Sequence, residues 1–467
     1  MSGLLHRAVL ATRTTPLVRS AWRAAYSGAS TSCAAGLGSL PGVRTVVLHR
    51  GAARSPDPGV SDLDFILLRD PLAPEEEPAW LIRLARAKRR LRRVFPMLGD
   101  LWVAEPAELE RYLCIGGLRA WEDRPGWRSL RGALPPPPPY AGDLLRRRLD
   151  AWVWAFTAHM ELTRRVFRPA PDLPAKREAD LRKMHADCRR LCDFTIDPSA
   201  AAPAPRPAPD PRPAAALWLE SARALSEAAS RILADASDGP SSAEAWPHPA
   251  AEATATAAER LRAELGARAL VLDAPYHSWV VLDDGTPTER LWNAAQALAE
   301  DPLMSGVPMA LTASSWSLLL QSSYLGAPLG GLDGPAARPG GGLFAGWGPA
   351  SVGDARGGLC RLPPAVRRAA AAEAASWMAL WWRSLWAEES FGNRFVLYHL
   401  HVRSAQLAST LAGRPVPSAW DALLEGPALR FAREEPAACV DAVPRAALSP
   451  THAVALARAM RRLGEAA

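Results

Sequence analysis

The first part of the chain alternates between the hydrophobic patterns of strands and those of helices. Three short apolar runs predict strands, and the first of them is rich in β-branched residues. These strands are expected at residues 43–48, 62–68 and 98–103. Between the last two, apolar residues recur at spacings of three and four, which predicts a helix over 75–94. Together with a preceding helix, this order predicts an α+β domain with a small mixed sheet over residues 1–134.

That preceding helix is expected over residues 3–27, with an interruption near Pro16. After five consecutive prolines the pattern becomes mainly helical. Accessory helices are predicted over 140–197, a Pro/Ala linker over 198–213, and a mostly helical C-terminal domain of unassigned role over 214–467. The elements expected in this last domain are helices at 214–236, 250–266, 364–388 and 396–411 and a strand pair at 269–272 and 278–282.

The composition is that of a folded protein, with 49% hydrophobic and 22% charged residues. A net charge of +7 over 467 residues does not by itself indicate a nucleic-acid partner, and a nucleic-acid acceptor is left open. No apolar run approaches the ~18 residues of a membrane span, and no signal-peptide core is present, so we expect a cytoplasmic protein without a membrane partner.

The charged residues before Asp57 are all basic. We interpret this segment as a basic helix beside a site for polyanions, with a mitochondrial transit peptide as the alternative. The six cysteines are scattered, which argues against a disulfide scaffold. Cys188 and Cys192 lie one helical turn apart and close to His185, but no fourth metal ligand is near, so we predict buried structural thiols.

The candidate functional residues lie at the second predicted strand and in the loop before it. Asp62 and Asp64 are two positions apart, so both side chains point to one face of the strand. Two like charges this close repel each other unless a cation lies between them. Mg²⁺ prefers oxygen ligands and is bound by a few carboxylates together with substrate phosphates. The loop that begins at Gly51 can bring backbone N–H groups against a polyphosphate. The alternative is a solvated strand edge with two surface carboxylates.

This segment resembles the DNA polymerase β-like nucleotidyltransferases, and the residues around its motif are similar to those of bacterial members. Gly51 matches the turn glycine of that family, Asp62 and Asp64 match its paired aspartates, and Asp100 on the third strand matches its third carboxylate. Arg-Gly before the gap and Pro-Gly-x-Ser-Asp-x-Asp after it carry the resemblance, which covers about residues 20–115. Glu105 competes as third carboxylate, but alternation places it on the opposite face.

The resemblance implies transfer of a nucleoside monophosphate from a nucleoside triphosphate such as ATP to a hydroxyl acceptor, by a two-metal mechanism with Mg²⁺ or Mn²⁺. Asp100 would also deprotonate the acceptor, which could be an antibiotic, a protein side chain or an RNA end. The residues implied to contact the nucleotide are Arg50, Gly51, Ala52 and Ser61. Ala52 replaces the family's serine, so the alternative is a catalytically reduced nucleotide-binding or toxin–antitoxin-like interaction protein that keeps the fold.

Two further groups of residues have weaker indications of function. Lys176, Arg177, Arg182 and Lys183 are interpreted as an exposed charged helix face, with phosphate contacts as the alternative. Arg394 and His399 are five apart and resemble the Arg-to-His motif of HEPN ribonucleases, which accompany minimal nucleotidyltransferases in toxin–antitoxin pairs. Phe395 stands where members of that family carry a polar residue, and the alternative is a helix whose imidazoles face other polar groups.

Overall fold

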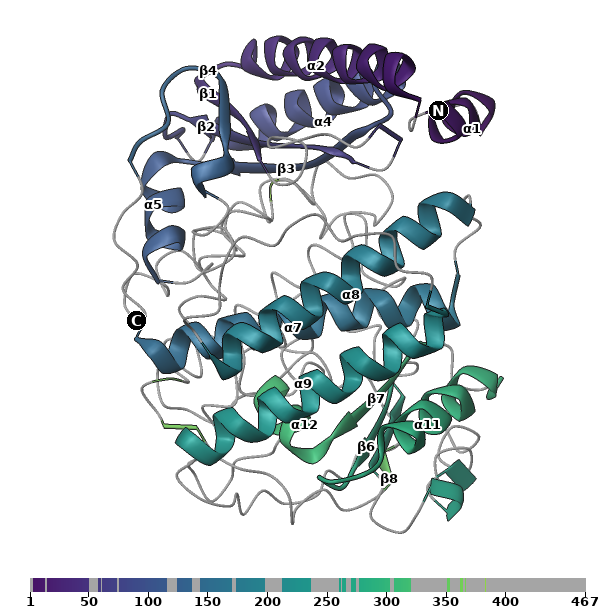
Figure 1. Ribbon diagram of the computed structural model, residues 1–467. Helices are drawn as coiled ribbons and strands as arrows, with labels where there is room; N and C mark the ends of the chain where they lie inside the picture. Colours follow the sequence, from purple (N-terminus) through teal and green to yellow (C-terminus); the bar gives the residue numbers. More distant parts are fainter. Residues whose placement is uncertain are drawn as a thin grey trace, which may run out of the picture.

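The computed structural model describes about half of the chain as two sheets with helices between them (Figure 1). The described residues are 3–12, 15–49, 58–59, 61–73, 75–115, 124–136, 143–169, 174–197, 212–236, 260–261, 263–265, 270–273, 277–302, 306–320, 351–352, 362–363, 366 and 383. The statements below concern these residues. Among them, no helix is long and apolar enough to cross a membrane.

The N-terminal sheet has the strand order β3-β2-β1-β4. β1 (Val43–His49) pairs antiparallel with β2 (Leu63–Arg69) and, on its other side, with β4 (Arg128–Arg131). β3 (Leu98–Ala104) runs parallel to β2, and parallel neighbours require a crossover connection. Helix α4 (Glu77–Val94) supplies that crossover. The three predicted strands and the predicted helix are therefore confirmed within a residue or two.

Helices cover both faces of this sheet. The predicted first helix is divided into α1 (Gly3–Thr12) and α2 (Pro16–Gly38), and Pro16 stands at the start of α2, where its missing N–H has no cost. α2 contacts α4 and β1 on one face. α5 (Pro106–Ile115) packs its buried side chains on the opposite face, and a short 3₁₀ turn, η1 (Arg124–Gly126), precedes β4.

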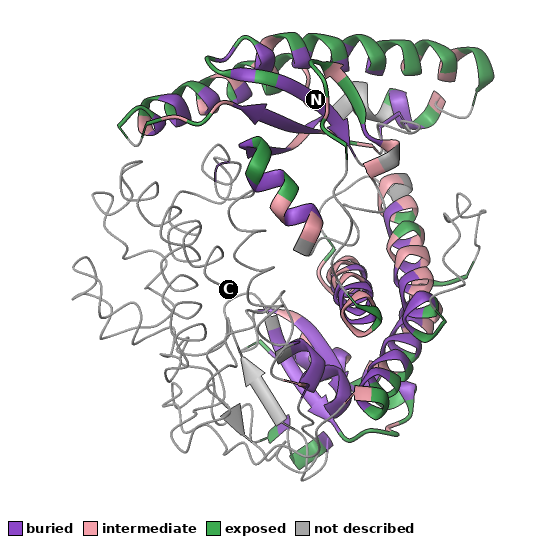
Figure 2. Cartoon of the chain, turned by 90° about the vertical axis from the view of Figure 1, so that its left-hand side faces the viewer, coloured by how far each residue is buried: buried purple, intermediate pink, exposed green. Residues whose placement is uncertain are grey.

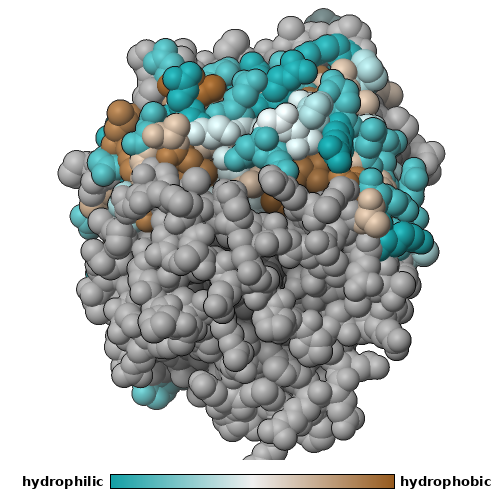
Figure 3. Space-filling view, turned by 90° about the horizontal axis from the view of Figure 1, so that it is seen from below, coloured by the Kyte–Doolittle hydropathy of each residue, from teal (hydrophilic) through white to brown (hydrophobic). Residues whose placement is uncertain are grey.

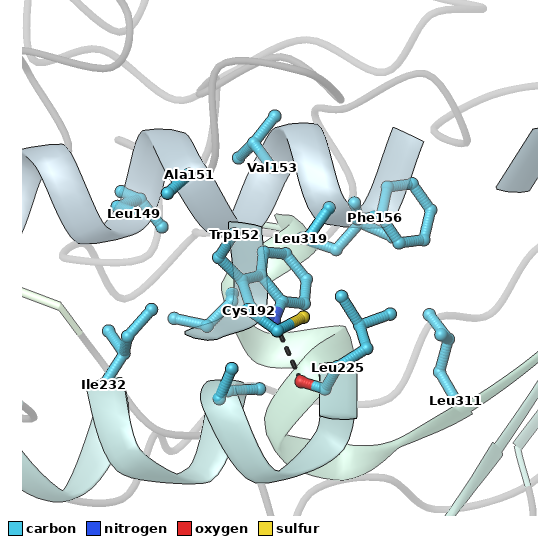
Figure 4. Packing of buried hydrophobic residues seen from close by; sticks show 14 of the residues in the cluster. Leu149, Ala151, Trp152, Val153, Phe156, Cys192, Leu225, Ile232, Leu311 and Leu319 are labelled. Carbon is cyan, nitrogen blue, oxygen red and sulfur yellow. Dashed lines mark hydrogen bonds between the residues drawn. The ribbon is translucent and has the colours of Figure 1, made fainter. Parts of the chain in front are cut away.

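Three long helices follow as a layer: α7 (Leu144–Phe167), α8 (Pro174–Ile196) and α9 (Ala214–Ala236). The two helices predicted within 140–197 and the helix predicted at 214–236 are thereby confirmed as helices. Their packed sides are buried, and their outer sides are partly exposed (Figure 2). Trp152 lies at the centre of this layer, fully buried, and its indole N–H donates to the carbonyl oxygen of Leu225 at 3.1 Å (Figure 4).

A second sheet lies beyond α9, with the order β7-β6-β5-β8. The predicted strand pair is confirmed as β5 (Leu270–Asp273) and β6 (His277–Leu282), which are antiparallel. The remaining elements were not predicted. They are α11 (Thr288–Glu300), β7 (Val307–Thr312), α12 (Ala313–Leu320) and β8 (Ser351–Val352).

The region expected to be mostly helical therefore also contains a four-stranded sheet. The described part of the chain is mixed α and β throughout, as the α+β prediction states. The predicted helices at 250–266, 364–388 and 396–411 fall almost entirely outside the described residues, as does the predicted linker at 198–213.

Candidate functional site

The paired aspartates lie where β2 begins. Asp62 immediately precedes the strand at an exposed position, and Asp64 is its second residue and half-buried. Leu63 and Phe65, which alternate with them, are fully buried. The apolar residues fix the register of the strand, because a slip by one position would bury both carboxylates. The two acids are thus held on one face of the sheet by the burial of their neighbours.

Gly99 on the adjacent strand makes room for this pair. A Cβ atom at Gly99 would lie 2.3 Å from Asp64 Oδ1 and 2.9 Å from Asp62 Cβ. Both distances are shorter than real Cβ contacts, so any other residue would push the carboxylates away. The pairing of β2 with β3 is also irregular here, between Leu63 and Phe65. The glycine and the irregular register together bring the backbone of β3 against the acids.

Asp100 is the next residue of β3 and is half-buried. Its backbone N–H donates to Asp64 Oδ1 at 2.8 Å. Trp102 and Ala104 pack with Ile66 on the face that α5 covers, and alternation places Asp100 and Asp64 on that same face.

Glu105, the competing carboxylate, lies just beyond the opposite end of β3, where its N–H donates to Glu108 Oε2 at 2.8 Å. The residue that the structure brings to the paired aspartates is therefore Asp100.

Electrostatic crowding in this group is concentrated on Asp62. Although Asp62 reaches the surface, the protein packed around its carboxylate raises its pKa, and the charges of Asp64 and then Asp100 raise it further. Lys176 opposes this effect and lowers the pKa of Asp62, while Asp180 raises it. Because both residues belong to α8, the start of the second accessory helix lies near the aspartates.

Lys88 is a second cation near the site, and the sequence patterns did not single it out. It is buried in the crossover helix α4, with 1% of its surface exposed. Burial lowers the pKa of Lys88 to about 8, and Arg92 also lowers it, while Asp100 and Asp64 raise it. Its position within the apolar stripe of α4 was the only available signal.

The other predicted nucleotide contacts are only partly described. Arg50, Gly51 and Ala52 lie outside the described residues, as do Arg394 and His399. Ser61 is half-buried and directly precedes Asp62. Gly59 anchors the same loop: its φ is +81°, and its N–H donates to the hydroxyl of Tyr26 at 2.9 Å. The end of the loop is thus tied to α2 three residues before the aspartates.

The remaining candidate residues belong to the helical layer. Cys188 and Cys192 are fully buried free thiols, as predicted, and His185 Nε2 lies 3.1 Å from Glu220 Oε2. Arg182 pairs with Glu178 on its own helix. Across the described residues, no group of three His, Cys, Asp or Glu side chains is arranged tightly enough to hold a metal ion. At the paired aspartates, the structure shows a hydrogen bond from the backbone N–H of Asp100 to Asp64 Oδ1.

The described part of the face seen in Figure 3 is mostly hydrophilic, with scattered hydrophobic positions.

The chain matches no protein-family model, no curated protein and no solved structure.

Proposed function

We propose that the N-terminal unit is a metal-dependent nucleotidyltransferase that uses Asp62, Asp64 and Asp100. The observation that carries this proposal is the close approach of three carboxylate-bearing residues on adjacent parallel strands, with a glycine that leaves space for them. Like charges held close together destabilise a fold, and burial, followed by the charges of Asp64 and Asp100, raises the pKa of Asp62. A bound cation offsets this destabilisation.

The donor set fits Mg²⁺ or Mn²⁺. Both prefer oxygen ligands, and Mg²⁺ is commonly held by one or two carboxylates plus substrate phosphates, so Asp62 and Asp64 would suffice for a first ion. When bound, such an ion neutralises charge on the triphosphate and on the leaving pyrophosphate. Asp64 would ligate through the oxygen that does not accept the Asp100 N–H. Asp100 would accept the proton of the attacking hydroxyl.

Lys176 supports the same proposal from the helical layer. Its charge lowers the pKa of Asp62, and we expect it to attract a triphosphate bound at that carboxylate. Asp180, one helical turn later, is bridged to Arg165 of α7 at 3.0 Å, which fixes the start of α8 against its neighbour. We expect Lys176→Ala to weaken nucleotide binding and to leave the Mg²⁺ requirement in place.

The test of this function is a comparison of Asp64→Asn with Asp70→Asn. Asp70 follows the far end of β2 and pairs with the exposed Arg44 at 2.6 Å, so it is a matched acid outside the site. Melting curves would be recorded with and without Mg²⁺ or Mn²⁺ and each nucleoside triphosphate, together with pyrophosphate release. Ligands that bind only the native state raise its melting temperature.

We expect the wild type and Asp70→Asn to shift with one nucleotide and Asp64→Asn not to shift. A wild type that shows no metal-dependent shift and releases no pyrophosphate would reject the proposal. Binding without pyrophosphate release would favour the alternative, a nucleotide-binding protein that keeps the fold.

A substitution at Ala52 can distinguish the active enzyme from that nucleotide-binding alternative. We expect Ala52→Ser to restore a phosphate contact of the loop. A neutral hydrogen bond contributes about 0.5–1.5 kcal/mol, so nucleotide affinity or turnover should rise roughly two- to tenfold. An unchanged or weaker response, measured by the same shifts and by pyrophosphate release, would mean that the loop has been rebuilt around alanine.

A further inference from the structure

The two sheets of this chain share one topology. In each sheet the first strand lies antiparallel to the second, the second lies parallel to the third, and the fourth pairs antiparallel with the free side of the first. The orders β3-β2-β1-β4 and β7-β6-β5-β8 are therefore equivalent. We call the elements from α2 to β4 the N-terminal unit and those from residue 260 to β8 the C-terminal unit.

The helices of the two units also occupy equivalent faces. In the N-terminal unit, Arg69 reaches from one face of β2 to Glu77 and Trp80 of the crossover helix, whereas Ile66 and Leu68 on the other face pack with α5. In the C-terminal unit, Val280 and Leu282 pack with the crossover helix α11. Trp279 and Val281 on the opposite face pack with α12. Both the crossover helix and the helix after the third strand thus lie where the equivalence requires.

A local contact recurs at the same place in both units. Where β3 leads into α5, Glu105 and Glu108 contact each other through the Glu105 N–H and Glu108 Oε2. Where β7 leads into α12, Thr312 Oγ1 donates to Ser315 Oγ at 3.1 Å. Each pair spans three residues, and its second member is the third residue of the helix. The chemistry differs, but the position of the contact is the same.

These correspondences align the two units residue by residue. Ile66 and Trp102 are neighbours on the α5 face, and Trp279 and Met309 are neighbours on the α12 face. In each unit the third-strand residue of this pair lies four positions before the following helix. Two positions before Trp279 and Met309, His277 stands at the place of Asp64 and Val307 stands at the place of Asp100.

The equivalent face is also covered in the C-terminal unit. Trp279 stacks on Phe156 of α7, with ring centroids 6.1 Å apart and an interplanar angle of 16°. Trp279 also contacts Trp316 of α12 at 5.5 Å. Leu311 of β7 belongs to the same cluster as Leu225 of α9 (Figure 4). The middle of this face is therefore apolar in both units, and the units differ at the strand starts, where Val307 packs against the apolar cluster at the place of Asp100.

We propose that the C-terminal unit is a second copy of the N-terminal fold that has lost the acids and now anchors the α7–α9 layer. The layer lies between the two copies and brings Lys176 of α8 to Asp62 of the N-terminal copy. The anchoring role stands independently of the catalytic proposal. A second part rests on the proposed function: the chain has one metal–nucleotide site, in the N-terminal copy.

Hydrogen exchange of the full chain tests the anchoring role. Trp279→Ala removes the ring that contacts Phe156 and Trp316, so amide protection should fall across α7–α9 and remain in β1–β3. Trp279→Phe keeps an aromatic contact and should retain most of the protection. Trp22→Ala is the matched control in the N-terminal unit, where the indole donates to Thr12 Oγ1 at 3.0 Å. If Trp279→Ala leaves α7–α9 as protected as Trp22→Ala does, the anchoring role is wrong.

Mn²⁺ titration with each nucleoside triphosphate, followed by electron paramagnetic resonance, tests the single site. The wild type should show one saturable nucleotide-dependent Mn²⁺ site, and Asp64→Asn should remove it. A saturable site that survives Asp64→Asn and disappears in His277→Ala would overturn the assignment of the C-terminal copy as metal-free. A wild type without any such site would reject the proposed function and the single-site part, while the hydrogen-exchange result would still decide the anchoring role.

Discussion

The N-terminal and C-terminal sheets have the same strand order, yet they carry different side chains on one face, where the second and third strands begin. In the N-terminal sheet, Asp62, Asp64 and Asp100 gather where β2 and β3 begin. In the C-terminal sheet, His277 and Val307 stand at the places of Asp64 and Asp100, and Val307 packs against the apolar cluster that contains Trp279 and Met309. The comparison teaches that this topology does not determine whether its face is a charged site or a packing surface. The side chains on alternate strand positions determine it.

The far ends of the two sheets differ as well. In the N-terminal unit, Glu77 pairs with Arg69 at 2.5 Å and with Arg383 at 2.7 Å, and Arg383 also pairs with Glu108 at 2.8 Å. All four residues are buried. In the C-terminal unit, hydroxyl groups at Thr312 and Ser315 stand at the positions of the carboxylates Glu105 and Glu108. The N-terminal unit thus has a buried network of paired charges at this end, whereas in the C-terminal unit Thr312 and Ser315 hydrogen-bond to each other and Asp284 accepts from Ser314.

The largest expected effect on stability comes from breaking the buried ion-pair network of the N-terminal unit. Burial alone would lower the pKa of Arg383, but Glu108 and Glu77 raise it, so the guanidinium stays charged. Arg383→Met leaves Glu108 buried without its cation. Removal of one partner of a buried ion pair costs about 3–5 kcal/mol. Urea unfolding followed by tryptophan fluorescence should show this loss, and Arg164→Met, at a partly exposed pair, serves as control. A loss no larger than that of the control would mean that the network is solvated.

A somewhat smaller effect is expected from acid on the layer between the sheets. His159 of α7 is fully buried beside Trp218, and burial lowers its pKa to about 3. The unfolded chain binds a proton below the ordinary pKa of about 6.5, whereas the native state does not, so stability falls as the pH drops from 6.5 towards 3.

At pH 4 the loss caused by His159 should be about 3 kcal/mol. His159→Leu removes this titration, so the difference in unfolding free energy between wild type and variant should change by that amount between pH 7 and pH 4. An equal acid response in both proteins would show that the imidazole is protonated in the native state.

The glycine beside the acids gives the next effect. Gly99→Ala places a Cβ against Asp64 and Asp62, and overpacking of this kind costs about 1–3 kcal/mol. It should also reduce nucleotide-dependent Mn²⁺ affinity, because the carboxylates must move. Gly28→Ala in α2 is the control, since a Cβ there meets nothing within 4 Å and alanine favours a helix. If both variants melt alike and bind alike, the close approach at Gly99 is not required.

The smallest effect concerns the charge of Asp62. Its pKa is raised in the folded state, so the stability that protonation provides is present at acidic pH and is lost as the pH rises through the folded pKa. Asp62→Asn should therefore stabilise the metal-free protein at pH 7, by less than about 1 kcal/mol because the group is exposed. Mg²⁺ should cancel the advantage. A variant that is less stable than the wild type without metal would contradict the crowding of the acids.

The sequence patterns predicted the N-terminal sheet better than the C-terminal one. β2 was predictable because Leu63 and Phe65 alternate with aspartates at its start. α4 was predictable because it has a long amphipathic stripe. β7 and α12 are adjacent and buried on all sides, and their apolar residues are mixed with Ser and Thr without a clear period, so no periodicity marks the boundary between them. The equivalence of the two sheets was not predicted, because it lies in strand pairing.

The candidate site was predictable only as far as local motifs reach. Asp62 and Asp64 follow from spacing within one strand, and Asp100 follows from the family pattern. Gly99 and Lys88 act through space: one matters because β3 lies against β2, and the other because α4 crosses behind the acids. Arg383 meets Glu77 across 306 residues, a pairing that no local pattern encodes.

That separation has a consequence for the order in which the protein can be completed during translation. Glu108 leaves the ribosome with the N-terminal unit, but the arginine that neutralises it follows 275 residues later. At synthesis rates of about 5–20 residues per second, the gap lasts roughly 15–55 s. During that interval we expect the nascent N-terminal unit to hold an uncompensated acid at its interior edge and to depend on chaperones or on local opening. The last third of the chain thus sets the time at which the first third becomes native.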